Sequence, residues 1–211
     1  MPPTPVAVAV GVLIAVALLG PAFDRRSVAI VALAAAMPDL DAVFALIGPG
    51  DPNAVFHSAF IPIGAAALLC YDIRFREASW LAGRYGWRGI RIAWVALAAY
   101  AVAGIGLDVF SAEGVALLYP LSDRYYSIVG RLVLSTQEGI VQTYVTLGNG
   151  WLEVASPGTT ETHTIETWLT GEKRRLRIVE SGWQAVIVAA AAASLPAKWL
   201  VERADRTGGR H

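Results

Sequence analysis

The sequence predicts an all-α membrane protein with about five membrane helices, a re-entrant or short helix, and a small β-containing insertion outside the membrane near residues 136–180. Two observations support the membrane class. Of the 211 residues, 55% are hydrophobic and only 16% are charged, whereas a soluble domain usually carries about 25% charged residues. The mean hydropathy is +0.51, and several long stretches hold no charge. A third observation predicts the β-containing insertion: apolar and polar residues alternate after position 136, which is typical of strands.

Net charge and cysteine content narrow the classes of function. The formal net charge is zero, so there is no reason to expect a nucleic acid as partner. The sequence has one cysteine, Cys70, which excludes an intrachain disulfide and a cysteine-based zinc cluster. Residues 1–5 carry no lysine or arginine, whereas a secretory signal begins with a positive region. We therefore expect the first apolar segment to stay in the membrane.

Two apolar segments, residues 6–19 and 27–47, open the chain. With its flanks, the first approaches the roughly 20 residues that a membrane helix needs. The second is interrupted by Pro38-Asp39-Leu40-Asp41. Because proline removes a backbone donor and disfavours helix at Met37, the chain is expected to bend there. Residues 48–53 are dense in glycine and proline and predict a loop.

Three further apolar segments complete the predicted set of membrane helices: residues 54–71, 92–107 and 183–201. Residues 109–121 are apolar but short, which favours a re-entrant or interfacial hairpin over a full crossing. Apolar and polar residues alternate in 140–147 and 162–169, as in strands. The predicted organisation is a helical core at 1–121, a partly β extramembrane excursion at 122–182, a final helix at 183–202 and a disordered tail at 203–211.

Basic residues predict the orientation in a plasma membrane, as a multi-pass protein. The strongest positive cluster near short apolar runs comprises Arg74, Arg76, Arg84, Arg88 and Arg91. Such clusters face the cytoplasm, which fits five crossings with the N-terminus outside. This topology puts His57, Asp108 and the excursion together on the outer side. The opposite topology stays open, because residues 173–177 place a second basic patch within the excursion.

Acidic and imidazole side chains at the ends of apolar segments indicate a metal site. Ionisable groups in such segments are costly and are usually kept because they bind or pair with something. The candidate ligands are Asp39, Asp41, His57 and Asp108. One imidazole and three carboxylates suit a divalent metal ion such as zinc, manganese or magnesium. We expect Asp41 also to be catalytic, by orienting or deprotonating an attacking water.

Each of these residues also has a simpler explanation. Asp39, Asp41 and Asp108 could cap the helices that follow them, since aspartate is a favoured N-cap residue. His57 could form hydrogen bonds at the membrane interface. Taken together, these residues favour the metal site, because separate apolar segments each carry an aspartate or histidine at their ends.

Several motifs in this chain resemble those of the membrane-bound metal-dependent hydrolases, also described as LexA-binding, inner-membrane-associated hydrolases. The resemblance covers roughly residues 30–127. It rests on Pro38-Asp39-Leu40-Asp41, on Phe56-His57-Ser58, and on the stretch from Gly106 through Asp108 to Leu121. It implies a multi-spanning hydrolase that uses a divalent metal ion.

The chain departs from the family pattern at two positions. Pro52 and Gly104 stand where the family carries histidines. Losing two imidazoles would weaken the binding of zinc and shift the preference toward oxygen-loving ions, or end catalysis. Asp51 is a candidate substitute ligand. His163 is a weaker one, because an exposed strand residue is the simpler explanation for it.

The leading hypothesis is a membrane-embedded metal-dependent hydrolase that acts on a lipid or lipid-linked ester or phosphoester at the membrane boundary. The alternative is a non-catalytic membrane protein of the same fold that binds a protein partner through residues 122–182. The substitutions at positions 52 and 104 favour this alternative. A small transporter ranks third, because the sequence shows no internal repeat of the kind that many transporters carry.

Overall fold

The computed structural model describes residues 2–41, 54–111, 114–128, 133–135, 139–142 and 178–208. The chain divides into two compact units. The helical unit comprises residues 3–37, 62–104 and 175–211, and the loop unit comprises residues 1–2, 38–61 and 105–174. Each unit is assembled from three separate stretches of the chain.

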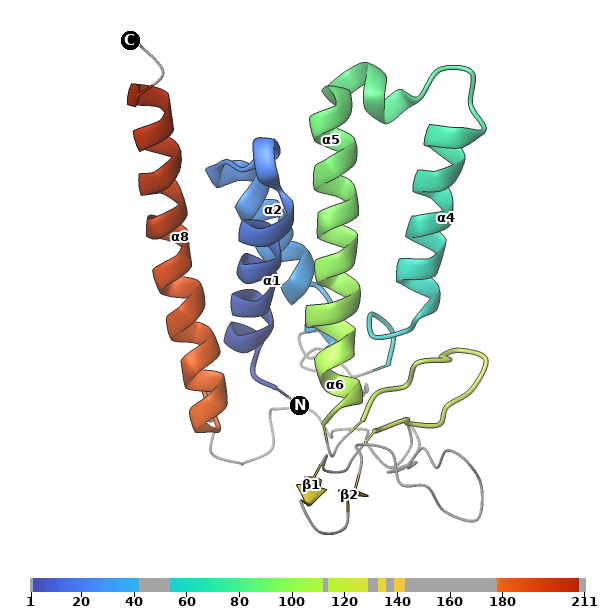
Figure 1. Cartoon of the computed structure of the whole chain (residues 1–211). Coiled ribbons are helices and arrows are strands. Elements are labelled where there is room, and N and C mark those ends of the chain that lie inside the picture. Colours follow the sequence, from blue (N-terminus) through green and yellow to red (C-terminus); the bar gives the residue numbers. More distant parts are fainter. Residues whose placement is uncertain are drawn as a thin grey trace, which may run out of the picture. The chain divides into compact units, whose positions relative to one another are not determined.

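The structure is mostly helical, as predicted (Figure 1). Among the described residues, five helices have ten residues or more: α1 (Thr4–Leu18), α2 (Arg25–Ala36), α4 (Phe60–Arg74), α5 (Trp80–Ala99) and α8 (Gly182–Gly208). A 3-10 turn, η1 (Gly20–Ala22), joins α1 to α2, and α5 continues into a π-helix, η2 (Tyr100–Gly106), and the short α6 (Leu107–Val109). Two of these helical segments, Trp80–Val109 and Gly182–Val201, are long and apolar enough to cross a membrane.

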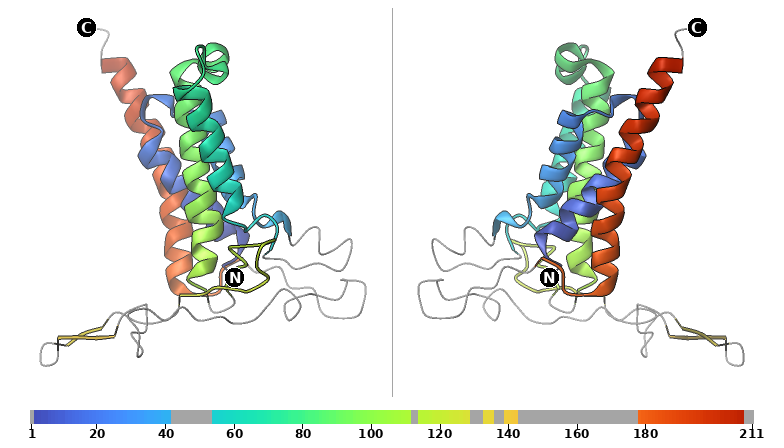
Figure 2. Two further views of the ribbon diagram at one scale, coloured as in Figure 1. Left: turned by 90° about the vertical axis from the view of Figure 1, so that its right-hand side faces the viewer. Right: turned by 90° about the vertical axis from the view of Figure 1, so that its left-hand side faces the viewer.

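The core of the helical unit lies where α1 packs against α2, α5 and α8, which run side by side (Figure 2). Ala15, Val31 and Ala99 are fully buried there. Small residues allow close approach, since a Cβ added at Gly11 would lie only 2.6 Å from the Cβ of Ala35. The tight packing of α1 on α2 therefore depends on glycine at position 11.

Capping side chains fix the ends of α2 and α5. The Asp24 carboxylate accepts a hydrogen bond from the Ser27 backbone N–H at 2.8 Å and caps α2. Ser79 caps α5 by accepting from the Ala82 N–H at 3.0 Å. Asp72 of α4 accepts from the Ser79 hydroxyl at 2.6 Å. The connection between α4 and α5 is thus held by a carboxylate that satisfies donors at the start of α5.

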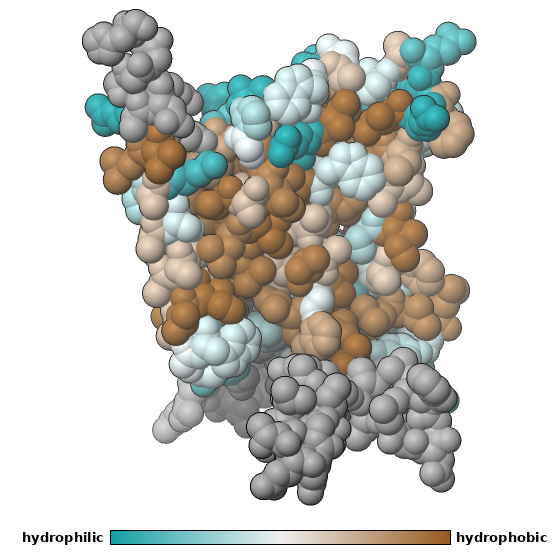
Figure 3. Space-filling model, viewed as in Figure 1, coloured by the Kyte–Doolittle hydropathy of each residue, from teal (hydrophilic) through white to brown (hydrophobic). Residues whose placement is uncertain are grey.

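The outer surface of the helical unit is largely apolar. α4 buries none of its residues, and Ile63 and Leu68 are exposed on it. Figure 3 shows apolar residues along the sides of the helices and hydrophilic residues at their upper ends, near the C-terminus. Exposed apolar patches of this extent mark surfaces that contact lipid or other proteins.

Several predicted boundaries differ from the structure. α8 runs to Gly208, so residues 203–208 are helical where a disordered tail was predicted. A re-entrant or interfacial hairpin was predicted at residues 109–121, whereas the described residues 114–128 form turns and an isolated bridge between Val115 and Tyr126. Two short strands, β1 (Val133–Ser135) and β2 (Gly139–Gln142), pair antiparallel. Most of the predicted β-containing insertion at 136–180, and the predicted loop at 48–53, lie outside the described residues.

Candidate metal centre

Two turns and one short helix of the loop unit carry Asp39, His57 and Asp108. Asp39 lies in the turn that follows α2, and Asp108 lies in α6. His57 lies in a turn at residues 54–59, because α4 begins only at Phe60 and not at residue 54 as predicted. Pro62, the third residue of α4, fits this boundary, because proline is tolerated in the first turn of a helix.

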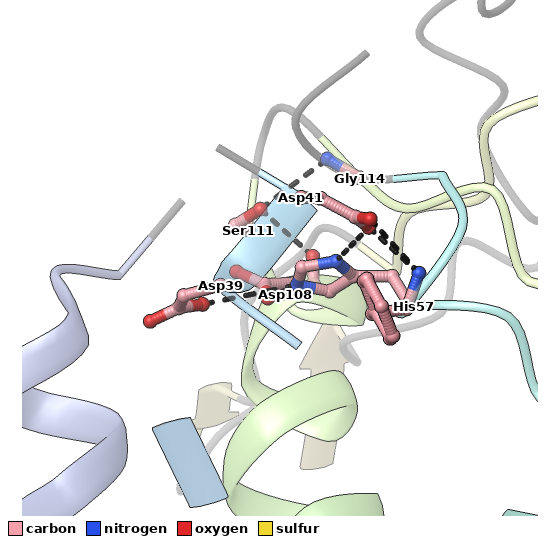
Figure 4. Close-up of polar contacts among 7 residues, drawn as sticks. Asp39, Asp41, His57, Asp108, Ser111 and Gly114 are labelled. Carbon is pink, nitrogen blue, oxygen red and sulfur yellow. Dashed lines mark hydrogen bonds and ion pairs between the residues drawn. The ribbon is translucent and has the colours of Figure 1, made fainter. Parts of the chain in front are cut away.

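One edge of the His57 ring faces two carboxylates (Figure 4). The Nε2 atom lies 3.0 Å from Oδ2 of Asp108 and 3.9 Å from Oδ1 of Asp39. One ligand atom from each of these three residues lies within 4.8 Å of the other two. The structure therefore brings Asp39, His57 and Asp108 around one point.

Asp41 contacts the opposite edge of the same ring. Its Oδ2 lies 3.1 Å from Nδ1 of His57. Both carboxylate oxygens also accept from the Phe56 backbone N–H, at 2.9 and 3.0 Å. Asp41 thus faces Nδ1 of the ring, whereas Asp39 and Asp108 face Nε2.

Backbone contacts hold the turns that carry these side chains. The Ser58 hydroxyl donates to the Tyr119 carbonyl at 2.6 Å, and the Ala59 N–H donates to the Leu117 carbonyl at 2.9 Å. Both bonds connect the turn of His57 to residues 114–128. Beneath them, Ala54, Ala116 and Tyr125 form a buried apolar cluster.

Ser111 fixes the chain that follows Asp108. Its hydroxyl donates to the Asp108 carbonyl at 2.7 Å and accepts from the Gly114 N–H at 3.2 Å. Gly114 has a φ of +71°, a conformation that favours glycine. Ser111 is not among the residues predicted for the site, although serine three residues after a turn residue is a common backbone-bonding pattern.

Burial and neighbouring charge act in opposite directions on His57. The side chain is fully buried, which by itself lowers its pKa. The adjacent carboxylates of Asp108 and Asp41 outweigh burial and raise the pKa of His57 to about 9. Without a metal ion, His57 is therefore a cation between two carboxylates near neutral pH.

The donor atoms present fit a divalent cation. Among the described residues, Oδ1 of Asp108 is buried without a hydrogen-bond partner, and the buried Nε2 of His57 has no partner besides the Asp108 carboxylate at 3.0 Å, although nearly all buried polar atoms in proteins are hydrogen-bonded. One imidazole nitrogen with two carboxylates is a ligand set that zinc and manganese accept. Gly104 offers no side-chain ligand here, and Pro52, Asp51 and His163 lie outside the described residues.

Comparison with known families places this site in a membrane protein. A family model described as YdjM inner membrane protein matches residues 1–194 of the chain. The chain belongs to this family. The YdjM family match confirms that the protein is associated with a membrane. No curated protein and no solved structure matches the chain.

Proposed function

We propose that this YdjM-family protein is a membrane-embedded, metal-dependent hydrolase that acts on a lipid or lipid-linked ester or phosphoester. The observation that supports this most is the buried Nε2 of His57, which lies 3.0 Å from the carboxylate of Asp108 and 3.9 Å from that of Asp39 and has no hydrogen bond to any other described residue. Buried ionisable groups in a membrane protein are usually kept because they serve a function.

Asp39, His57 and Asp108 would hold the divalent ion. When bound, the ion would polarise the scissile group and lower the pKa of a water molecule. Asp39 is the most exposed of the three, with 11% of its side chain accessible against 4% for Asp108. Because it is the carboxylate nearest to solvent, we assign to Asp39 the role of accepting a proton from water, which the sequence analysis gave to Asp41.

Asp41 is better suited to positioning His57. A carboxylate that accepts from Nδ1–H fixes the tautomer in which the Nε2 lone pair is available to a cation. The Phe56 N–H and the His57 ring already occupy both oxygens of Asp41. These contacts keep Asp41 on the Nδ1 edge of the ring, away from the Nε2 edge that Asp39 and Asp108 face.

The proposed topology has five crossings, by α1, α2, α4, α5 and α8. α1, α2 and α4 have 15, 12 and 15 residues, fewer than the roughly 17–25 of a typical membrane helix, so the bilayer would thin around them. Arg25 begins α2, whereas Asp39 follows α2 along the chain. With the arginines in the cytoplasm, Asp39 belongs to the outer end of α2. The ester or phosphoester would then be reached from the outer leaflet.

An activity assay with matched variants tests the hydrolase. Purified protein loaded with zinc or manganese is assayed against fluorogenic lipid esters and phosphoesters. Asp108→Asn should lower turnover by ~100-fold, because it removes a charged ligand. Asp123→Asn makes the same chemical change at an exposed position of the loop unit and should leave turnover unchanged. No turnover of any substrate, or equal turnover in the two variants, contradicts the proposal.

The alternative is a non-catalytic protein that binds a partner through residues 122–182. One observation favours it: His57 as a cation between Asp41 and Asp108 is a self-contained ion-pair cluster, and positions 52 and 104 lack the imidazoles of the resembled family. An Asp39→Asn/Asp108→Asn protein that folds and keeps its cellular function would support this alternative.

A further inference from the structure

Positive side chains gather around the turn that joins α1 to α2 in the helical unit. Nη2 of Arg88 lies 2.9 Å from a carboxylate oxygen of Asp24. Nε of Arg91 donates to the Leu18 carbonyl at 2.8 Å. The Arg91 guanidinium lies against Gly20, where a Cβ would stand 3.1 Å from Nη2. These contacts hold two arginines of α5 at the turn.

Two more cations flank an aromatic pair at the same turn. The rings of Phe23 and Trp199 have centroids 6.4 Å apart. The Arg25 guanidinium carbon lies 5.4 Å from the centroid of Trp199, and Nζ of Lys198 lies 5.9 Å from that of Phe23. Such cation–π contacts orient the cations. An aromatic ring carries no net charge, so these contacts leave the positive charges of Arg25 and Lys198 unneutralised.

The carboxylate at this turn is already engaged. Asp24 pairs with Arg88 and accepts hydrogen bonds from Ser27. The hydrogen bond from the Ser27 backbone N–H lowers the pKa of Asp24, so its charge persists but offsets only one arginine. Within the part of the chain that the structure describes, neither Arg25 nor Lys198 forms an ion pair with a carboxylate.

We propose that Arg25, Lys198 and Trp199 form a binding site for the headgroup phosphate of an anionic phospholipid. Arginine and lysine are the side chains that bind phosphate oxygens, and tryptophan favours the membrane interface. Leu200 and Val201 are exposed next to Trp199 on α8, where they offer apolar contacts to acyl chains. Basic residues at the cytoplasmic ends of membrane helices bind anionic lipid headgroups. This site is independent of the proposed hydrolase.

Lipid retention by the full-length protein tests the site. The protein is released from micelles that contain phosphatidylglycerol and phosphatidylcholine in equal amounts, and retained lipids are identified by native mass spectrometry. The wild type should retain phosphatidylglycerol preferentially. Arg25→Gln/Lys198→Gln should lower that preference by about tenfold, because each cation near the surface contributes to binding.

The control removes two cations elsewhere in the helical unit. Arg74 and Arg84 are exposed and do not belong to the cluster around Phe23 and Trp199, since Arg84 lies over Tyr85. The variant Arg74→Gln/Arg84→Gln should therefore retain the preference for phosphatidylglycerol. Equal losses in both double variants would overturn the proposal, since they would indicate a general charge effect. Displacement of phosphatidylglycerol by millimolar inorganic phosphate would also overturn it, because the site would then bind free phosphate.

A measurement on the wild type covers the case in which the double variant fails to fold. Phosphatidylglycerol should raise the thermal unfolding temperature more than phosphatidylcholine does, since a ligand that binds only the folded state stabilises it. The conservative variant Arg25→Lys/Lys198→Arg should keep this difference. Equal unfolding temperatures in the two lipids would overturn the proposal whatever the variants show.

Discussion

Asp41 lies 3.1 Å from Nδ1 of His57, on the ring edge opposite the Nε2 atom that Asp108 approaches at 3.0 Å. The two nitrogen atoms of this imidazole therefore have different surroundings. On one edge the ring is held by Asp41, which the Phe56 N–H fixes in turn. On the other edge, the buried Nε2 faces the carboxylate of Asp108 and has no hydrogen bond to any other described residue. This asymmetry makes Asp41 a positioning residue and Asp108 a ligand in our account.

The distinction predicts different effects of two neutral substitutions. Asp41→Asn keeps an oxygen that accepts from Nδ1–H but loses the charge, so metal affinity should fall by roughly 10–100-fold while one ion still binds. Asp39→Asn removes a ligand and should lower the amount bound at saturation. Competition with a chromophoric chelator measures both quantities. If Asp41→Asn instead loses the ion as Asp39→Asn does, Asp41 is a ligand, as the sequence analysis predicted.

The pH dependence of stability follows from His57. Its pKa is raised from the ordinary value of 6.5 to about 9 in the folded protein. The ion pairs of His57 therefore stabilise the metal-free protein fully below about pH 6.5, and this stabilisation is lost as the pH rises through about 9. Thermal unfolding in the presence of a chelator between pH 6 and 9.5 measures the loss. His57→Gln should flatten this part of the profile, and an unchanged profile in that variant would contradict the assignment.

Metal affinity should show the opposite trend. A metal ion must displace the proton on His57, so binding releases a proton and strengthens with rising pH until His57 is neutral, at about pH 9. Zinc titrations by calorimetry in two buffers of different ionisation enthalpy report the number of protons released. Affinity that does not change between pH 6.5 and 9 would show that the ion does not bind His57.

Ser111 should stabilise the loop that holds Asp108. Ser111→Ala removes the hydrogen bonds to the Asp108 carbonyl and the Gly114 N–H, at a cost of about 1 kcal/mol each or more, because both groups are part-buried. Ser122→Ala is the control, since among the described residues its hydroxyl accepts one long, exposed bond, from the Arg124 N–H at 3.3 Å. Thermal unfolding compares them. Similar unfolding temperatures would mean that Ser111 does not hold this loop.

Glycine at position 11 should be required for the packing of α1 on α2. Gly11→Leu places a side chain where a Cβ alone would meet that of Ala35 at 2.6 Å, so α1 and α2 must separate and the unfolding temperature should fall. Gly64→Ala in α4 meets nothing within 4 Å and should be neutral or slightly stabilising, since alanine favours helix over glycine. Equal effects of the two substitutions would contradict the close packing.

The helices could be predicted from the sequence because long apolar segments have few alternatives in a membrane. The predicted segments at 6–19, 92–107 and 183–201 lie largely within α1, α5 with η2, and α8. Helix ends were less predictable. α4 begins at Phe60 and α8 runs to Gly208, because local caps and tertiary contacts decide where a helix ends and hydropathy does not.

The set of site residues could also be proposed from sequence, but their separate roles could not. An acid or imidazole at the end of an apolar segment signals a buried polar cluster. Spacing alone does not show which ring nitrogen each carboxylate faces. Asp39 and Asp41 are two residues apart, yet they approach different edges of His57. The hydroxyls of Ser58 and Ser111 donate hydrogen bonds to backbone carbonyls across turns. No periodic pattern in the sequence predicts such hydrogen bonds.

The metal content of the purified protein tests the central claim most directly. The protein is dialysed against a chelator, reloaded with zinc or manganese, freed of excess ion and analysed by atomic spectrometry. We predict about one ion per chain in the wild type and in Asp123→Asn, and a strong loss in His57→Gln and Asp108→Asn. Wild-type protein that retains no divalent ion, or His57→Gln that retains as much as wild type, would contradict it.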